Sequence, residues 1–270
     1  MFSHELPSVD VVIRARGHSK LLSTAVNSIL SQKNVLSSFI IVNSFTSSSD
    51  FSSLANNLVV VPYCAERFNY SEAINIAFPL LKSEYTLVIS SHTAIYNSLA
   101  LQYGVSLLES NPLVAAVNFS DSREGSLSCI SIDASSFNGW NGTWNTASLY
   151  RTELLKSRPF RPEILSAEDQ EWSRWAIEQM GMLILHINGC CTKNLNPRKS
   201  SVAKKLKEWE FISAFAYPLY LSPGFILSRL KYSVILLSRF QVRGAMFECM
   251  VAFVLIRVRL FGVYSTSSSY

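Results

Sequence analysis

Short runs of β-branched residues alternate with helical stripes of apolar residues in the first part of the chain. Residues 9–15 (VDVVIRA) are typical of a buried parallel strand, and similar runs fall at 38–43 and 58–62. Apolar residues at helical spacing over 21–32 predict a helix between the first two strands, and a short helix is expected near 50–57. Strands and helices in this order predict an α/β fold with a doubly wound, mostly parallel sheet.

The alternation continues further along the chain. A helix is predicted over 70–81, a buried strand over 85–90 and a helix over 96–110. Residues 120–142 are irregular, and we expect them to form an insertion that crosses a pocket. The remaining predictions are a strand at 113–119, a helix at 146–156, a loop at 159–167, a helix at 167–180 and a strand at 183–187.

The last quarter of the chain has a different pattern. Residues 198–207 are basic, and residues 211–263 form apolar stretches that charged residues and prolines interrupt before any run approaches the ~20 residues that span a bilayer. We therefore predict two units, an α/β unit over 1–197 and an amphipathic helical extension over 198–270. The extension either lies at a membrane interface or packs on the first unit as ordinary helices.

Charge separates these two parts. From Arg198 onward there are eleven lysines and arginines but three acidic residues, whereas the preceding 197 residues hold thirteen basic and sixteen acidic residues. A basic tail that is also strongly apolar suggests a membrane surface more than a nucleic acid. The run of Lys204, Lys205 and Lys207 is interpreted as a solvated or lipid-facing patch, and no nucleic-acid partner is expected.

Cysteine usage and the start of the chain bear on its compartment. The five cysteines have no metal-type spacing, and their odd number favours free thiols. The opening MFSHELPSVD lacks the basic and apolar regions of a secretion signal. We expect a cytoplasmic protein, either free or peripheral at the inner face of the cell membrane.

Several common enzyme classes lack their sequence signature here. There is no G-x-G-x-x-G fingerprint, which disfavours a dinucleotide dehydrogenase. A Walker loop, a G-x-S-x-G nucleophile motif and a clustered His/Cys zinc pattern are also absent from the sequence.

The strongest candidate for chemistry at a strand end is the polar tip that follows strand 85–90. In open α/β sheets, ligands bind at the carboxyl ends of the strands, where Ser90, Ser91 and His92 are expected. A histidine there can ligate a metal or donate to a phosphate, although a polar turn would also account for it. Arg14 ends the first strand near the same crevice and either faces phosphate or pairs with a nearby acid.

Two asparagines are further candidates for the same crevice. Asn43, at the end of the second strand, and Asn75, on the helix before the tip, could each bond a nucleobase or ribose. Asparagine is unfavourable inside a helix, so Asn75 requires a reason, which a cap or a buried hydrogen bond would equally supply.

The helix predicted at 167–180 begins with two acids, Glu168 and Asp169. A carboxylate on a rigid helix terminus can remove the proton from an attacking hydroxyl group. Two acids at this place also simply complement the helix dipole. The nearby Trp172 and Trp175 either stack on a sugar or base, or belong to the core.

Five segments together resemble family-2 glycosyltransferases with the GT-A fold, over roughly residues 8–194. The opening VDVVIRARGHSKLLSTAVNSILSQ resembles SVVIRTxN…LxxxLxSxxxQ, and IIVNSFTSSSD resembles IVVVDSGSTDGT. FNYSEAINIAFPLLKSEYTLVISSHTAI resembles FSYxxALNxGIxxAxGExVxxLSAHxxP of a subgroup with a Ser-x-His motif in place of the acidic DxD motif. WNTASLYR resembles NxxSAxRR, and EILSAEDQEWSRWAIEQMG resembles xLPGAEDxxWAxRxxxxG.

The resemblance implies inverting transfer of a hexosyl or deoxyhexosyl unit from a nucleotide-diphosphate sugar to a polysaccharide or lipid-linked acceptor, as in polysaccharide biosynthesis. It implies that Asp169 is the general base, with Glu168 beside it. The candidate cofactor is Mg²⁺ or Mn²⁺, with His92 as the candidate metal ligand. The donor is expected to contact Arg14, Asn43, Asn75, Ser90, Ser91 and His92, and the acceptor Trp144, Asn145 and Trp172.

The sequence also departs from the family pattern. Asn43, Phe45 and Ser48 replace an Asp, a Gly and an Asp, and Asn194 stands where many relatives have a metal-ligating His. A second hypothesis is therefore a non-catalytic relative that binds a nucleotide or a partner glycosyltransferase. A third and weaker one, based on the tail alone, is a membrane-anchored structural protein.

Overall fold

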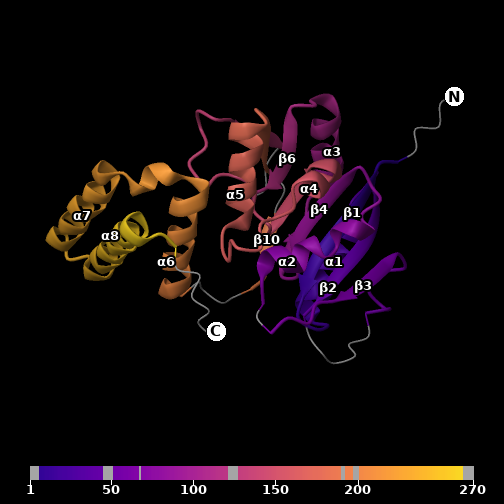
Figure 1. The fold of residues 1–270 in the computed structure, drawn as a ribbon. Coiled ribbons are helices and arrows are strands. Elements are labelled where there is room, and N and C mark those ends of the chain that lie inside the picture. The colour runs from indigo at the N-terminus through magenta and orange to yellow at the C-terminus, as the bar shows by residue number, and fades with distance from the viewer. Residues whose placement is uncertain are drawn as a thin grey trace.

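The structure is a mixed sheet covered by helices on both faces, with a helical extension beside it (Figure 1). The computed structural model describes residues 6–44, 51–66, 68–120, 127–189, 192–196 and 201–263. Its strands are β1 (Ser8–Ala15), β2 (Leu36–Asn43), β3 (Leu58–Pro62), β4 (Tyr85–Ser90), β5 (Thr93–Ile95), β6 (Val114–Phe119), β7 (Ser128–Ile132), β8 (Ala147–Arg151), β9 (Leu183–Asn188) and β10 (Thr192–Asn194). Its α-helices are α1 (Lys20–Leu30), α2 (Tyr70–Asn75), α3 (Ala100–Ser110), α4 (Thr152–Ser157), α5 (Glu168–Arg174), α6 (Val202–Phe211), α7 (Pro223–Ser238) and α8 (Val242–Phe261).

The main sheet has eight strands in the order β3-β2-β1-β4-β8-β6-β9-β7. Strands β3, β2, β1 and β4 are parallel, and so are β6 and β9, whereas β8 and β7 are antiparallel to their neighbours. The register aligns Arg14 of β1 with Ser90 of β4, so both side chains reach the same edge of the sheet. The small β5–β10 pair lies outside this sheet. The predicted α/β class with a mostly parallel sheet is confirmed.

Two apolar cores sandwich the sheet because its central strands are buried on both faces. Val11 and Ile13 of β1 pack into the core under α1 and α3, while Val12 points into the core under α2, α4 and α5. This explains the near-continuous apolar runs in the sequence, since a strand covered on both faces has no solvent side. The second core includes Trp172, whose helix α5 carries the predicted acids.

The main difference from prediction lies at 146–156, where we expected one helix. The segment forms strand β8 and then helix α4. Strand β8 fills the space between β4 and β6, where its backbone pairs on both sides. Leu149 and Tyr150 point into opposite cores, which is a period of two. Local helix propensity was overridden by this central position in the sheet.

Other predicted helices are also shorter than expected, including α3 and α5. Helix α2 ends at Asn75 and is followed by a 3-10 turn over Phe78–Leu80, because Pro79 lacks the amide hydrogen that a longer helix would use. Of the helix expected near 50–57, the described residues 51–57 form turns. Residues Phe45 and Ser48, which depart from the family pattern, lie outside the described residues.

The extension is helical, as predicted, and packs against α5 and the loop before β8. The Trp140 and Trp209 rings lie 5.0 Å apart, and the Tyr220 hydroxyl donates to the Asn138 carbonyl at 2.7 Å. Helices α7 and α8 form a small core of their own and extend away from the sheet (Figure 1). Within the described ranges, we found no helix with both the length and the apolar character needed to cross a membrane.

Candidate active site

A cavity of about 440 Å³ lies at the carboxyl ends of β1 and β4, beside the start of α5. This is where the topology of an open α/β sheet places ligands, and the volume is in the range of small-molecule sites. Seven of the residues predicted to act in catalysis or binding line it, namely Arg14, Ser90, His92, Trp144, Asn145, Glu168 and Asp169.

Asp169 is held in a fixed orientation in this cavity. The backbone N–H of Asn145 donates to its Oδ2 at 3.0 Å, and that of Gln170 donates to its Oδ1 at 2.9 Å. Its own carbonyl accepts from the Ser173 hydroxyl at 2.7 Å. The residue two positions earlier, Ala167, has a left-handed backbone (φ 61°), an unusual conformation for a residue with a side chain. Backbone donors and this turn together orient the carboxylate.

Asn145 connects the two acids to the core. Its side-chain amide donates to Glu168 Oε1 at 3.1 Å, and its Oδ1 accepts from the hydroxyl of the fully buried Tyr150 at 2.9 Å. Buried polar groups are normally satisfied in this way, and removing a shared partner leaves the others unpaired. Asn145 is therefore a structural element of the acidic side of the cavity.

The environment of Asp169 suits proton transfer. Burial raises the pKa of its carboxyl group to about 7, and the negative charge of Glu168 acts in the same direction. The two backbone N–H donors and the Arg14 charge oppose this rise in pKa. A carboxyl group with a pKa near 7 is a better general base at neutral pH than an ordinary aspartate.

Arg14 lines the same cavity, with its guanidinium group 4.6 Å from the centre of the Tyr70 ring. Its Nη1 atom is buried and has no hydrogen-bond partner among the described residues. A buried donor of a charged group is costly when unpaired, so this atom is available to an anionic ligand.

The polar tip also belongs to the cavity. The Ser90 hydroxyl donates to the Asn145 carbonyl at 3.3 Å, which ties the tip to the acidic side. Burial lowers the pKa of His92, and the charges of Arg14 and Lys204 lower it further, so the ring is neutral at pH 7. Ser91 is half-buried next to them but does not line the cavity.

Three other predicted contact residues occupy structural positions instead. The Asn43 side chain accepts from the Gly17 N–H at 2.9 Å and so closes the turn after β1. Asn75 bridges to both backbone groups of Phe160, donating to its carbonyl and accepting from its N–H. Trp172 is fully buried, so its ring does not border an acceptor. Asn75 therefore makes the hydrogen bonds that we gave as an alternative to a ligand contact, and Trp172 has the core position that we gave as an alternative to stacking.

Lys204, Glu208 and Ile212 line the cavity from the extension, although the sequence did not single them out as site residues. Lys204 belongs to the basic run that we interpreted as a solvated or lipid-facing patch, and for this lysine that interpretation is incomplete. No local signal distinguishes it from Lys205, because only the packing of α6 selects which lysine turns toward the sheet.

His186 of β9 contacts the loop before β8 and does not line the cavity. Its Nε2 lies 2.9 Å and 3.0 Å from the carbonyls of Asn141 and Gly142, and its ring packs edge-on against Trp144. It therefore supports the loop that carries Trp144 from behind.

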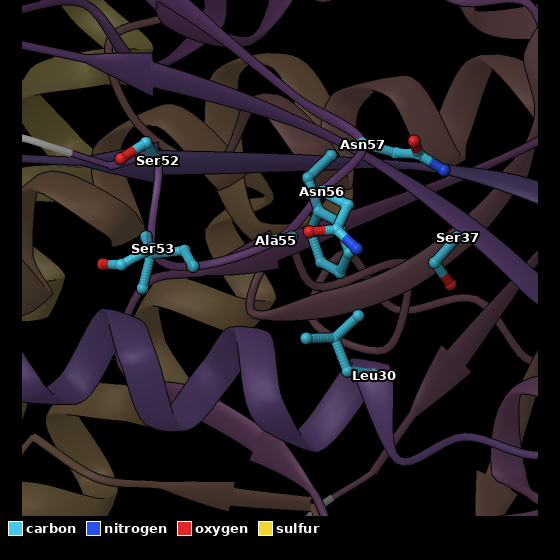
Figure 2. Close-up of a pocket in the computed structure, with 9 residues that line it drawn as sticks. Leu30, Ser37, Ser52, Ser53, Ala55, Asn56 and Asn57 are labelled. Carbon is cyan, nitrogen blue, oxygen red and sulfur yellow. The ribbon is translucent and has the colours of Figure 1, made fainter.

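A second cavity, of about 360 Å³, lies between the end of α1 and the turn that precedes β3 (Figure 2). Leu30, Ser37 and Asn56 are among the residues that line it. Ser37 lies near the amino end of β2, so this cavity is at the edge of the sheet opposite to the polar tip. Its position and its side chains, mostly serine, asparagine and alkyl groups, give it no evident chemistry.

Fold and cavity together define an α/β protein of the GT-A type. No family profile matches the sequence, and no curated protein sequence matches it. Among solved structures, the chain is similar to the mannosyltransferase PcManGT from Pyrobaculum calidifontis in complex with GDP-Man and Mn²⁺, with a TM-score of 0.61 and 13% identity over 94% of this chain and 87% of that one. It is also similar to S. aureus TarS 1-349 in complex with UDP, with a TM-score of 0.53 and 15% identity over 96% of this chain and 93% of that one. At these identities the likeness establishes the fold.

Proposed function

We propose that this chain is a glycosyltransferase of family 2 that transfers a hexosyl or deoxyhexosyl unit from a nucleotide-diphosphate sugar to an acceptor hydroxyl group with inversion. The observation that carries the proposal is the position of Asp169, a carboxyl group with a pKa of about 7 in the same cavity as the cationic Arg14 and the polar tip. The fold shared with a mannosyltransferase bound to GDP-Man supports the choice of donor class.

In the proposed reaction the acceptor oxygen attacks C1 of the donor sugar while its proton passes to an Asp169 carboxylate oxygen. The C1–O bond to the β-phosphate breaks, and its electron pair leaves with the nucleoside diphosphate. Attack and departure take place on opposite faces of C1, so the configuration inverts. Asp169 acts as general base, and its two backbone donors keep it oriented toward the acceptor.

The two substrates are assigned to opposite sides of the cavity. Arg14, Ser90 and His92 form the donor side, and Trp144 with Asn145 borders the acceptor, a glycan or a lipid-linked saccharide. Trp144 is exposed enough to stack on a sugar ring. Asn43, Asn75, Ser91 and Trp172 are proposed to support these contacts from behind.

The test is a transfer assay with a panel of UDP-, GDP- and dTDP-sugars. The Asp169→Asn variant should lose about 10²-fold to 10⁴-fold in transfer rate, the range for removal of a general base. Asp133→Asn is the matched control, since Asp133 lies in an exposed turn where it accepts from Ser135 and Ser136. Full transfer by Asp169→Asn would remove Asp169 from the base role. Nucleotide binding without any transfer by the natural sequence would favour the non-catalytic alternative.

We further propose that the turn between α7 and α8 contacts an anionic membrane surface. Phe240 at this turn is 92% exposed, and Arg239, Arg243 and Lys231 lie close to it in sequence. The other exposed apolar side chains nearby are Tyr232, Val234, Ile235, Leu237, Val242 and Met246. Apolar side chains among cations match the acyl and phosphate layers of a bilayer surface.

Flotation with anionic and with zwitterionic vesicles tests this contact. The chain should float with anionic vesicles, and the double variant Phe240→Glu with Met246→Glu should not. Leu36→Glu, which alters an exposed leucine on the sheet, is the control. Equal flotation by the double variant would refute the contact, and dimers in solution would assign the apolar surface to a second copy. The exposed free thiols of Cys64, Cys129 and Cys249 support a location of the protein on the cytoplasmic side of the membrane.

A further inference from the structure

The described residues around the polar tip do not match a site for a divalent cation. Among the described residues, no three His, Cys, Asp or Glu side chains are grouped so that they could hold a metal ion. At the tip, His92 is the only strong ligand, and the Ser90 hydroxyl already donates to the Asn145 carbonyl. Mg²⁺ and Mn²⁺ prefer carboxylate oxygens, and the tip has none. The complex of the similar mannosyltransferase PcManGT contains Mn²⁺. The side chains at the polar tip of this chain, in contrast, do not provide the ligands that Mn²⁺ prefers.

The same part of the cavity is instead supplied with fixed positive charge. Arg14 is anchored in β1, and its guanidinium group rests on the Tyr70 ring at 4.6 Å, which limits its movement. Its buried Nη1 donor has no partner among the described residues. A guanidinium group offers a planar set of donors that matches two phosphate oxygens at once. This unpaired donor can therefore bind an anion in the cavity.

A second cation comes from the extension. Lys204, in the first turn of α6, lines the cavity. Its ammonium group is 3.9 Å from Glu208 Oε1, and its side chain is 58% exposed, so this ion pair is weak and readily exchanged. The charges of Arg14 and Lys204 both lower the pKa of His92, which agrees with both cations lying near its ring in the cavity.

We propose that Arg14 and Lys204 bind the donor diphosphate directly, so that this chain binds its nucleotide without a divalent cation. This inference rests on the proposed function and specifies how its donor site works. The leaving nucleoside diphosphate gains negative charge as its bond to the sugar breaks, and two cations placed at that point stabilise it. Helix α6 is then part of the donor site, and the extension contributes to binding as well as to attachment.

Calorimetry on the full chain with UDP and with GDP tests the inference. Each titration is done first with excess EDTA and then with excess Mn²⁺. The expected result is a dissociation constant that differs by less than about threefold between the two conditions for whichever nucleotide binds. Tightening by Mn²⁺ of about tenfold or more would overturn the inference while leaving the proposed function intact. No binding of either nucleotide in either condition would count against both.

Variants identify the two cations. In EDTA, Arg14→Met and Lys204→Met should each weaken nucleotide binding at least about tenfold, as expected for loss of a charge-assisted contact. Lys204→Arg should retain binding, and Lys205→Met, on the same helix but outside the cavity, should bind like the natural sequence. The affinity for inorganic pyrophosphate, which lacks base and ribose, should fall in Arg14→Met and Lys204→Met as the nucleotide affinity does. Unchanged binding by a folded Lys204→Met variant, verified by thermal unfolding, would refute the role of the extension.

Discussion

The cavity has two walls that differ in how completely their polar groups are bonded. The carboxylate wall consists of Asn145, Glu168 and Asp169, and each of these side chains has a hydrogen bond to a neighbour within the protein. The cationic wall consists of Arg14 and Lys204, with the neutral ring of His92 near them. There, a buried guanidinium donor has no partner among the described residues, and the Lys204 ion pair is long and exposed.

This difference indicates which wall is complete before a ligand arrives. A proton acceptor works best when it is held rigidly, because misplacement by about 1 Å is costly in rate. An anion site, in contrast, needs donors that are not already used. The carboxylate wall therefore has the order that catalysis requires, and the cationic wall has the unsatisfied donors that binding requires.

Breaking the carboxylate wall should have the largest effect. Asn145→Ala removes the partner of both the Glu168 carboxylate and the buried Tyr150 hydroxyl. The free energy of unfolding should fall by about 2 to 4 kcal/mol, because two buried polar groups lose their hydrogen bonds. Denaturant unfolding measures this change. The control Asn56→Ala, at an exposed position, should stay within about 0.5 kcal/mol of the natural sequence.

The pH dependence of stability should show the raised pKa of Asp169. A carboxyl group whose pKa is about 7 when folded, and near 4 when unfolded, stabilises the fold fully below pH 4. That contribution is lost as the pH rises through 7, because the unfolded chain releases its proton first. The stability of the natural sequence relative to Asp169→Asn should therefore fall by on the order of 4 kcal/mol between pH 4 and pH 8. An unchanged difference across this range would show that Asp169 has an ordinary pKa.

The pH dependence of the transfer rate should show whether the two walls interact, because the Arg14 charge lowers the pKa of Asp169. The limiting rate at saturating donor should rise with pH and level off above about 7, and be about tenfold lower one unit below that pKa. In Arg14→Met the rise should shift to higher pH, since the opposing charge is gone. A profile that keeps its midpoint in this variant would mean that the two walls are not coupled electrostatically.

The smallest effect is expected at the turn before the acids. Ala167 is left-handed, and glycine adopts this conformation without the steric cost of a Cβ atom. Ala167→Gly should raise the free energy of unfolding by about 0.5 kcal/mol, the net of relieved strain and greater unfolded-state entropy. Thermal unfolding measures it, and transfer should change little. A loss of stability would show that the Cβ atom makes contacts worth more than the strain.

Much of the fold could be predicted because its signals are local. The strand over Tyr85–Ser90 lies where its apolar run predicted it, and β1 and β2 begin within two residues of their predicted starts. Strand β8 was missed because its five residues carry a pattern that a helix also tolerates. Only its two neighbours, β4 and β6, supply the backbone partners that make it a strand.

The candidate site divides in a similar way. Residue type and order alone were enough to single out Arg14, His92 and Asp169, because a strand end or a helix start places a side chain in a known direction. The roles of Asn75 and Trp172 were not readable in this way. A buried hydrogen bond to Phe160 and full burial in the core depend on partners 85 residues and 14 residues away, such as the Arg158 carbonyl that accepts from the Trp172 ring.

The sequence by itself thus determined the α/β class, several strands such as β1, β2 and β4, and the identity of seven of the residues that line the cavity, since these follow from short-range patterns of burial and capping. Only the tertiary structure decided that Lys204 faces the cavity while Lys205 does not, and that Asp169 is a carboxyl group with a pKa near 7. The physical reason is that desolvation and charge interactions depend on distances between segments far apart in the chain. No residue pattern encodes those distances until the chain has packed.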